Sequence, residues 1–367
     1  MSVRHSRLST QLRRAPTRYE PTHRLAAGGM AEVWKAIAHF DDARAHTVAL
    51  KRVLPELASQ ELYRSMFEDE ARLGMRLQHP NIVRIYDARE IGGTFIMVME
   101  LVDGTSLKGI LDRAHARGAR MPVATALWIT LALARALDYA HGAEDDHGAP
   151  MGIIHRDVSP HNLLVGVDGA VKLADFGLAD ATVHQTQLGD GMLGGKLGYL
   201  APELIEQRPS TPQVDVFAVG IVLWEMLCGR SLFRRDDDAE TVRAVARAEV
   251  PPPSSLDPRI PPGVDALVAS VLARDPDARM PGAGALVRAL EALLREIDPG
   301  VSENDIALIV GLHLATDPPP AQTLAQAPAE MFLAELEAFV TSAGPLSAGE
   351  APLDPSLFDR GGPTHRR

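Results

Sequence analysis

The chain has 367 residues, of which 46% are apolar and 23% carry a charged side chain, as in a soluble globular protein with a sizeable core. Its formal net charge of −11 argues against a general binder of nucleic acid or of an anionic membrane surface, because both need an excess of basic residues. A single cysteine, Cys228, excludes an intrachain disulfide framework and fits a reducing compartment. No secretory signal is recognisable, and the longest apolar stretches fall short of the roughly 20 residues that cross a bilayer. The sequence therefore predicts a cytoplasmic protein without a membrane span.

The first part of the chain predicts a small lobe built around a sheet. Residues 1–18 are basic and are predicted to form a flexible tail. Residues 19–102 contain the β-rich runs "VALKRVL" and "TFIMVMELV", each bounded by turn residues. Between these runs, Met66, Leu73 and Leu77 recur at helical spacing. The pattern predicts a β-rich N-terminal lobe with one helix.

Residues 103–298 predict a larger, mostly helical lobe. Two stretches there, "VATALWITLALARALDYAH" and "QVDVFAVGIVLWEMLCG", are apolar on nearly every side, which is typical of buried helices. A small sheet lobe followed by a larger helical lobe predicts an α+β fold with two lobes and a cleft between them.

Residues 299–367 are predicted to form a helical extension followed by a loose tail. Phe332, Leu336 and Phe339 recur at helical spacing and indicate one docked helix. Roughly the last 25 residues are rich in Pro, Gly and Ser, which disfavours a packed structure. Two roles of the extension stay open, which are packing on the larger lobe and recruitment of a protein partner.

Several short motifs follow one another along the chain. "VALK" ends at Lys51, "HRDVSPHN" occupies residues 155–162, "DFG" begins at Asp175 and "APE" occupies residues 201–203. In this order they resemble a eukaryotic-like (Hanks-type) serine/threonine protein kinase of the kind found in bacteria. The resemblance covers residues 19–295 and implies the bilobal protein-kinase fold, with a small β-rich N-lobe and a larger helical C-lobe.

The resemblance implies transfer of the γ-phosphoryl group of ATP to serine or threonine hydroxyls of protein substrates, in intracellular signalling and with autophosphorylation. Asp157 matches the catalytic base. Asn162 and Asp175 match the Mg²⁺ ligands, and Mg²⁺ prefers such hard oxygen donors. Thr182 and Thr186 are the candidate phosphorylation sites of the activation loop.

The segment "LAAGGMAEVWKA" aligns with the glycine-rich loop of the family. Gly28 and Gly29 remain where the backbone must approach phosphates, whereas Ala26 and Ala31 replace the other two glycines. The resemblance assigns the other nucleotide contacts to Val33, Ala49, Lys51, Met99, Glu100, Val102 and Leu164.

Helical spacing places Glu70 on the apolar stripe of its helix, together with Met66 and Leu77. A buried carboxylate must be paired or neutralised, and the resemblance names Lys51 as its partner. Three structural residues are also implied: Glu203 paired with Arg279, and Asp215 as a brace for the catalytic loop. Arg156 would bind an activation-loop phosphate.

The loop "HRDVSPHN" departs from the family at Ser159, where a lysine is usual. In "GGKLGYLAPE", Lys196 stands where the family has a threonine that lies near that lysine. We therefore expect an exchange, in which Lys196 supplies the ammonium group and Ser159 the hydroxyl group.

Two other functions stay open at this stage. A pseudokinase acting as a nucleotide-binding scaffold is favoured by Ser159, Ala26 and Ala31. A small-molecule phosphotransferase shares a similar catalytic loop, but "APE" and Asp215 count against it. The protein substrate, the upstream signal and the oligomeric state are not indicated by the sequence.

Overall fold

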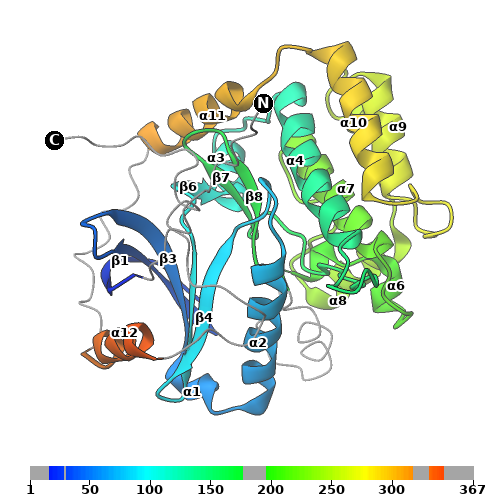
Figure 1. The fold of residues 1–367 in the computed structure, drawn as a ribbon. Helices are drawn as coiled ribbons and strands as arrows, with labels where there is room; N and C mark the ends of the chain where they lie inside the picture. The colour runs from blue at the N-terminus through cyan, green and yellow to red at the C-terminus, as the bar shows by residue number, and fades with distance from the viewer. Residues whose placement is uncertain (1–15, 29, 177–195, 317–329, 343–367) are drawn as a thin grey trace, which may run out of the picture. The chain divides into compact units, whose positions relative to one another are not determined.

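A computed structural model describes residues 16–28, 30–176, 196–316 and 330–342 (Figure 1). The chain divides into two compact units. The first comprises Met1–Arg64, Ile85–Leu101 and Leu324–Arg367, and the second comprises Ser65–Arg84 and Val102–Thr323. The first is built around a sheet and the second is mainly helical, which confirms the predicted α+β class and bilobal fold.

The first unit contains a five-stranded antiparallel sheet. Its strands are β1 (Arg18–Ala27), β2 (Ala31–His39), β3 (Ala45–Val53), β4 (Ile85–Ile91) and β5 (Thr94–Glu100), in the order β1-β2-β3-β5-β4. Along β2, Trp34, Ala36 and Ala38 are buried, whereas Val33 and Ile37 are half-buried. The sheet therefore has two distinct faces, as the alternation of side chains along a strand requires. The short helix α1 (Pro55–Ala58) follows β3.

Helix α12 (Glu330–Thr341) covers the more deeply buried face of this sheet (Figure 1). Phe332, Leu336 and Phe339 are each at most 2% exposed and join the apolar cluster of the sheet. The ring centroids of Tyr19 and Phe339 lie 5.7 Å apart at an interplanar angle of 84°, the edge-to-face geometry that aromatic pairs prefer. The predicted helix is thus present, and it packs on the sheet of the first unit.

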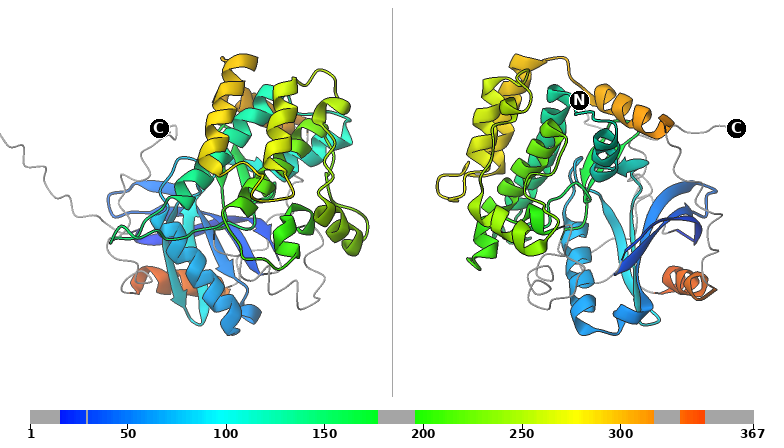
Figure 2. Two further views of the ribbon diagram at one scale, coloured as in Figure 1. Left: turned by 90° about the vertical axis from the view of Figure 1, so that its right-hand side faces the viewer. Right: turned by 180° about the vertical axis from the view of Figure 1, so that it is seen from behind.

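The second unit is organised around helix α4 (Val123–His141), which packs against α7 (Gln213–Cys228) and α10 (Ala283–Ile297) (Figure 2). Within the described residues, α4 is the one helix long and apolar enough to cross a membrane, and 67% of its most apolar window is buried in this core. The remaining elements are α2 (Glu61–Arg76), α3 (Leu107–Ala116), α6 (Pro202–Ile205), α8 (Asp238–Arg247), α9 (Pro262–Val271), the 3₁₀ turns η1 (Leu197–Tyr199) and η2 (Pro253–Ser255), and a small sheet of β6 (Gly104–Ser106), β7 (Leu163–Gly166) and β8 (Val171–Leu173).

Helix α11 (Glu303–Thr316) packs within the second unit, on β7 and α3. Arg113 donates a hydrogen bond from Nη1 to the His313 carbonyl oxygen at 2.8 Å. Gly169 has a φ of +87°, and a Cβ built there would lie 1.9 Å from the Glu303 carbonyl oxygen, so only glycine allows this approach. The extension is therefore shared, with α11 in the second unit and α12 in the first.

A buried ion pair ties the segment "APE" to the C-terminal part of the second unit. Arg279 donates to Glu203 through Nη1 at 2.6 Å and through Nη2 at 3.0 Å, and both residues are 3% exposed. The predicted partnership of these two residues is confirmed. Such a two-point pair holds orientation as well as charge.

Candidate active site

Residues 155–162 connect α4 to β7 in the second unit, and four polar side chains of this segment are buried. His155, Asp157, Ser159 and Asn162 expose 0%, 5%, 1% and 6% of their surface. Because buried polar groups need hydrogen-bond partners, the contacts of these four side chains determine what the segment can do.

One carboxylate from α7 holds the backbone of this segment. Asp215, which is fully buried, accepts hydrogen bonds from the backbone N–H of His155 at 2.8 Å and of Arg156 at 2.7 Å. His141 bonds to the same carboxylate through Nε2 at 2.8 Å. Arg156 has the left-handed φ of 58°, a conformation that costs on the order of 1–3 kcal/mol and needs such support. The predicted bracing by Asp215 is confirmed.

The Asp157 carboxylate is held through one of its two oxygens. Oδ2 accepts a hydrogen bond from Asn162 Nδ2 at 2.8 Å and forms an ion pair with Lys196 Nζ at 2.5 Å. Asn162 Nδ2 also donates to the Asp157 carbonyl oxygen at 2.9 Å. The other carboxylate oxygen, Oδ1, accepts no hydrogen bond from the part of the chain that the structure describes.

Lys196 therefore lies beside the predicted catalytic base, although 39 residues separate the two in sequence. It directly precedes η1, and its side chain is 34% exposed, so the side chain is accessible as well as paired. Ionised partners make such a hydrogen bond shorter and stronger than a neutral one.

Ser159 stands close to this cluster in sequence, but its hydroxyl group has no partner among the described residues. It is 1% exposed, and Oγ makes no hydrogen bond with the described residues. A buried hydroxyl without a partner costs about 1–3 kcal/mol. The structure thus brings Lys196 to Asp157 and not to the Ser159 hydroxyl.

His155 connects this segment to the predicted metal ligand Asp175. Its Nδ1 accepts from the backbone N–H of Asp157 at 3.2 Å, so Nε2 is the protonated nitrogen that donates to the Ala174 carbonyl oxygen at 3.0 Å. Its ring meets Phe176 edge-on, with centroids 4.6 Å apart. Asp175 lies between these contacts with a left-handed φ of 61°. Two strained, non-glycine residues therefore flank the site, Arg156 and Asp175, as is common at active sites.

Glu225, which the motifs did not indicate, anchors η1, the turn that Lys196 directly precedes. The Tyr199 hydroxyl in η1 donates to Glu225 Oε2 at 2.7 Å, and the Leu232 backbone N–H donates to Oε1 at 3.1 Å. Burial raises the pKa of Glu225. The available signal was a carboxylate within the apolar run that follows Asp215 in α7, because a buried charge needs a partner.

In the first unit, four predicted nucleotide contacts share one face of the sheet. Val33 lies opposite Lys51 in the β2–β3 pairing, and Ala49 lies opposite Met99 in the β3–β5 pairing. Paired residues project to the same face, as do residues two apart on one strand. The strand register therefore gathers Val33, Ala49, Lys51 and Met99, and Glu100 ends β5 beside them.

Neither the backbone conformation nor the packing around residue 28 requires a glycine there. A Cβ built there would have the Ala31 carbonyl oxygen as its nearest neighbour at 3.7 Å, which is an ordinary contact. The missing side chain leaves space in front of the turn between β1 and β2, as a closely approaching phosphate would need. Gly29, Thr182 and Thr186 lie outside the described residues.

The remaining predicted residues belong to the second unit. Glu70 on α2 is 1% exposed and shares its buried side with Met66 and Leu77, in agreement with the predicted inward face. Its pairing with Lys51, which belongs to the first unit, stays a prediction. Val102 and Leu164 are half-buried.

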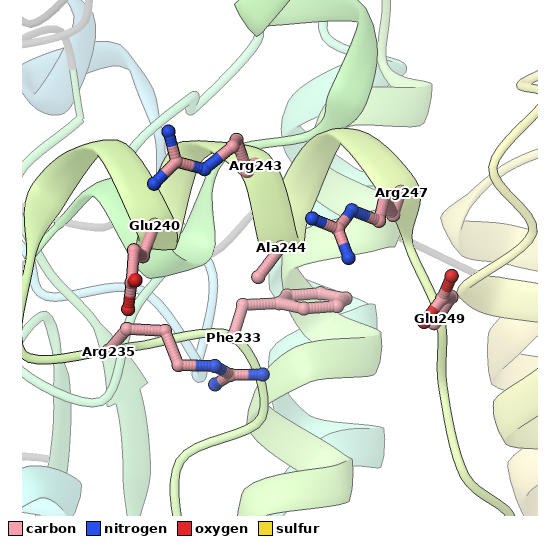
Figure 3. A pocket seen from close by; sticks show the side chains of 7 residues that line it. All are labelled: Phe233, Arg235, Glu240, Arg243, Ala244, Arg247 and Glu249. Carbon is pink, nitrogen blue, oxygen red and sulfur yellow. The ribbon is translucent and has the colours of Figure 1, made fainter.

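A separate pocket of about 230 Å³ lies in the second unit, around α8 (Figure 3). In Figure 3, Arg235 and Arg247 point toward Phe233, whereas Arg243 points away from it. Its wall also includes Glu240 and Glu249. Because its charges are mixed and it contains none of the predicted site residues, it does not contribute to the chemistry of residues 155–162.

Residues 19–289 match the family model of the protein kinase domain. Among solved structures, the kinase domain of PknI from Mycobacterium tuberculosis is similar, with a TM-score of 0.55 and 26% sequence identity over 76% of this chain and 96% of that chain.

Curated relatives carry two kinds of kinase name. Tyrosine-protein kinase MasK of Myxococcus xanthus is 34% identical over 278 residues, which are 76% of this chain and 43% of that protein. Serine/threonine-protein kinase PknH of Mycobacterium bovis is 32% identical over 346 residues, which are 92% of this chain and 55% of that protein. Serine/threonine-protein kinase PknD of Mycobacterium tuberculosis is 33% identical over 344 residues, which are 92% of this chain and 47% of that protein. The chain spans about half the length of these relatives.

The position of Lys196 can be tested without an activity measurement. Partial burial and the ammonium groups of Lys108 and Lys196 lower the pKa of the His161 imidazole. Because a nearby positive charge disfavours the protonated ring, Lys196→Met should raise this pKa. An NMR titration, with His161→Gln to assign the signal, measures the change. Lys172→Met is the control, and equal His161 pKa values in the two lysine variants would place Lys196 elsewhere.

Proposed function

Because the chain belongs to the protein kinase domain family, we propose that it transfers the γ-phosphoryl group of ATP to serine and threonine hydroxyls of protein substrates. The observation that carries the proposal is the contact of the buried Asp157 with Asn162 and Lys196, on a backbone held by Asp215. Serine/threonine kinases among its relatives support the same acceptor class.

Asp157 is the catalytic base in this proposal. Its Oδ2 is held by Asn162 and Lys196, while Oδ1 takes no hydrogen bond from the described residues and can accept the proton of the substrate hydroxyl. A base that is fixed through one oxygen and open at the other needs little reorganisation to act.

The family implies ATP and a divalent metal ion, and we assign Mg²⁺ as this metal. Asn162 donates its described hydrogen bonds through Nδ2, so the amide oxygen is available as a hard ligand, and Asp175 supplies a carboxylate. A bound Mg²⁺ would neutralise charge on the ATP phosphates. The space at Gly28 fits the phosphates themselves.

Lys196 replaces the usual catalytic-loop lysine in this proposal. Its ammonium group lies at the catalytic carboxylate, where it can also reach a phosphate oxygen, because 34% of its side chain is exposed. The buried Ser159 hydroxyl, which lacks a partner among the described residues, would then gain a bond from bound substrate or water.

Tyrosine is the second candidate acceptor, because MasK is named a tyrosine-protein kinase and is 34% identical to this chain. Phosphoamino-acid analysis of the labelled product separates the two.

A pseudokinase is not favoured, because the base and both metal ligands are retained in sequence. We place the reaction in the cytoplasm, where ATP is supplied and the buried thiol of Cys228 stays reduced.

The transfer reaction is tested with labelled ATP and Mg²⁺, using wild type beside Asp157→Asn. Loss of the general base should lower the rate by about 10²–10⁴-fold, while circular dichroism stays unchanged. Label in both proteins, or in neither, would contradict the proposed reaction. Mass spectrometry of the labelled wild type also tests autophosphorylation at Thr182 and Thr186.

The role of Lys196 is tested by Lys196→Met and Lys196→Arg. Removing a donor that stabilises developing charge lowers kcat by about 10²–10³-fold, so Lys196→Met should fall in this range. Lys196→Arg, which keeps the charge, should lose less. Lys172→Met is the matched control on β8. A kcat of Lys196→Met within a few-fold of that control would exclude the role.

Nucleotide approach at Gly28 is tested by Gly28→Ala. Since the exposed turn has room for a Cβ, the free energy of unfolding should change by less than about 0.5 kcal/mol. The KM for ATP should rise, because the methyl group fills the space meant for phosphate. Gly104→Ala gives the opposite pattern, because its Cβ would lie 2.0 Å from the Val165 carbonyl oxygen and should destabilise the fold. An unchanged KM for Gly28→Ala would argue against phosphate contact there.

A further inference from the structure

Helix α12 contacts strand β3 through a buried ion pair as well as through its apolar stripe. Arg52 of β3 donates to Glu335 of α12 from Nε to Oε2 at 2.6 Å and from Nη2 to Oε1 at 2.6 Å. Arg52 is 4% exposed and Glu335 is 9% exposed. This two-point geometry fixes the guanidinium plane, which a single hydrogen bond would not do.

The guanidinium group of Arg52 is surrounded by further partners. Its Nη1 donates to Glu32 of β2 at 3.2 Å, and its central carbon lies 5.1 Å from the centre of the Phe332 ring. Burial acts against the charged form, but hydrogen bonds from Arg52 to Glu335 and Glu32 outweigh it and raise the pKa of Arg52. Removing one carboxylate would leave a buried charge only partly compensated.

Arg52 immediately follows Lys51, the predicted ATP-contacting lysine. Neighbouring residues of a strand project to opposite faces, so α12 holds Arg52 on one face while Lys51 projects from the other. Arg52 is also the last β3 residue in the pairing with β5, opposite Ile96. The pairing of β3 with β2 continues through Val53, so the backbone of β3 is held on one side here, and the Arg52 side chain adds α12 as a further support beside Lys51.

We propose that Glu335 is a positioning residue for ATP binding: through Arg52, helix α12 sets the position of the β3 segment that carries Lys51. The inference rests on the proposed function, since it assigns the nucleotide contact to Lys51. In this proposal α12 contributes to ATP binding by holding the strand that carries Lys51.

A second contact of α12 provides a control at its other end. Arg89 of β4 donates from Nη1 to the carbonyl oxygens of Phe339 at 2.7 Å and Ser342 at 2.8 Å, and it pairs with Asp87 at 2.6 Å. Arginine here satisfies carbonyl groups that the end of a helix leaves without partners. Loss of Arg89 removes the contact at the C-terminal end of α12 and retains both partners of the Arg52–Glu335 pair.

The test compares full-length wild type with Glu335→Gln, Glu337→Gln and Arg89→Met. For each, the affinity for a fluorescent ATP analogue, the KM for ATP, kcat and the unfolding temperature are measured. Glu335→Gln should weaken nucleotide binding and raise KM about tenfold, with kcat within about twofold of wild type. Glu337→Gln, on the exposed side of α12, should match wild type, and Arg89→Met should lower the unfolding temperature at unchanged KM.

Equal nucleotide affinities for Glu335→Gln and Glu337→Gln would overturn the inference, as would an increase in KM for Arg89→Met as large as that for Glu335→Gln. The double variant Arg52→Met/Glu335→Gln should bind ATP no more weakly than Arg52→Met alone, because the two residues act as one unit. If Glu335→Gln does not fold, Glu335→Asp enters the same comparison. A wild type that binds no nucleotide would refute the proposed function as well, whereas binding that is equal in all variants would refute only the role of Glu335.

Discussion

The segment of residues 155–162 depends on Asp215, a carboxylate that no water solvates. An ionised group at 0% exposure is tolerated only when its oxygens are fully hydrogen-bonded, and two backbone N–H groups and one imidazole bond this carboxylate. The same bonds fix the left-handed backbone at Arg156. Asp157 follows directly on that backbone, so a buried charge on α7 sets the position of the predicted base.

Buried ion pairs join distant parts of the chain in both units. Arg279 with Glu203 does so in the second unit, and Arg52 with Glu335 does so in the first. A buried pair is a weak source of stability, because the desolvation of both charges offsets their attraction. Its directional hydrogen bonds instead define which segments meet and in what orientation. This is the property that a site built from several segments requires.

Lys196 shows how a charged group can reach a site from a distant segment of the chain. An ammonium group stabilises charge that develops in a transition state by its position, whichever segment supplies it. Lys196 reaches Asp157 from η1, which is anchored by the Tyr199–Glu225 bond, and Ser159 leaves an unpartnered hydroxyl among the described residues. One part of the exchange expected from sequence is therefore observed: the Lys196 ammonium group lies at Asp157. The other part is not observed, because the Ser159 hydroxyl group forms no hydrogen bond with Lys196.

The sequence by itself determined the fold class and the helices and strands with clear periodicity, and it predicted Asp157, Asn162 and Asp175 as the chemical core. These follow from local spacing and motif order, which are properties of short segments. Only the tertiary structure decided that Lys196 pairs with Asp157 and that α12 joins the sheet through Arg52 and Glu335, which are 283 residues apart. The stripe of Phe332, Leu336 and Phe339 indicated that α12 docks. It did not indicate on which surface, because the burial of apolar area is non-directional. The pairing of α12 with β3 is specified by Arg52 and Glu335, because charges that become buried must be paired.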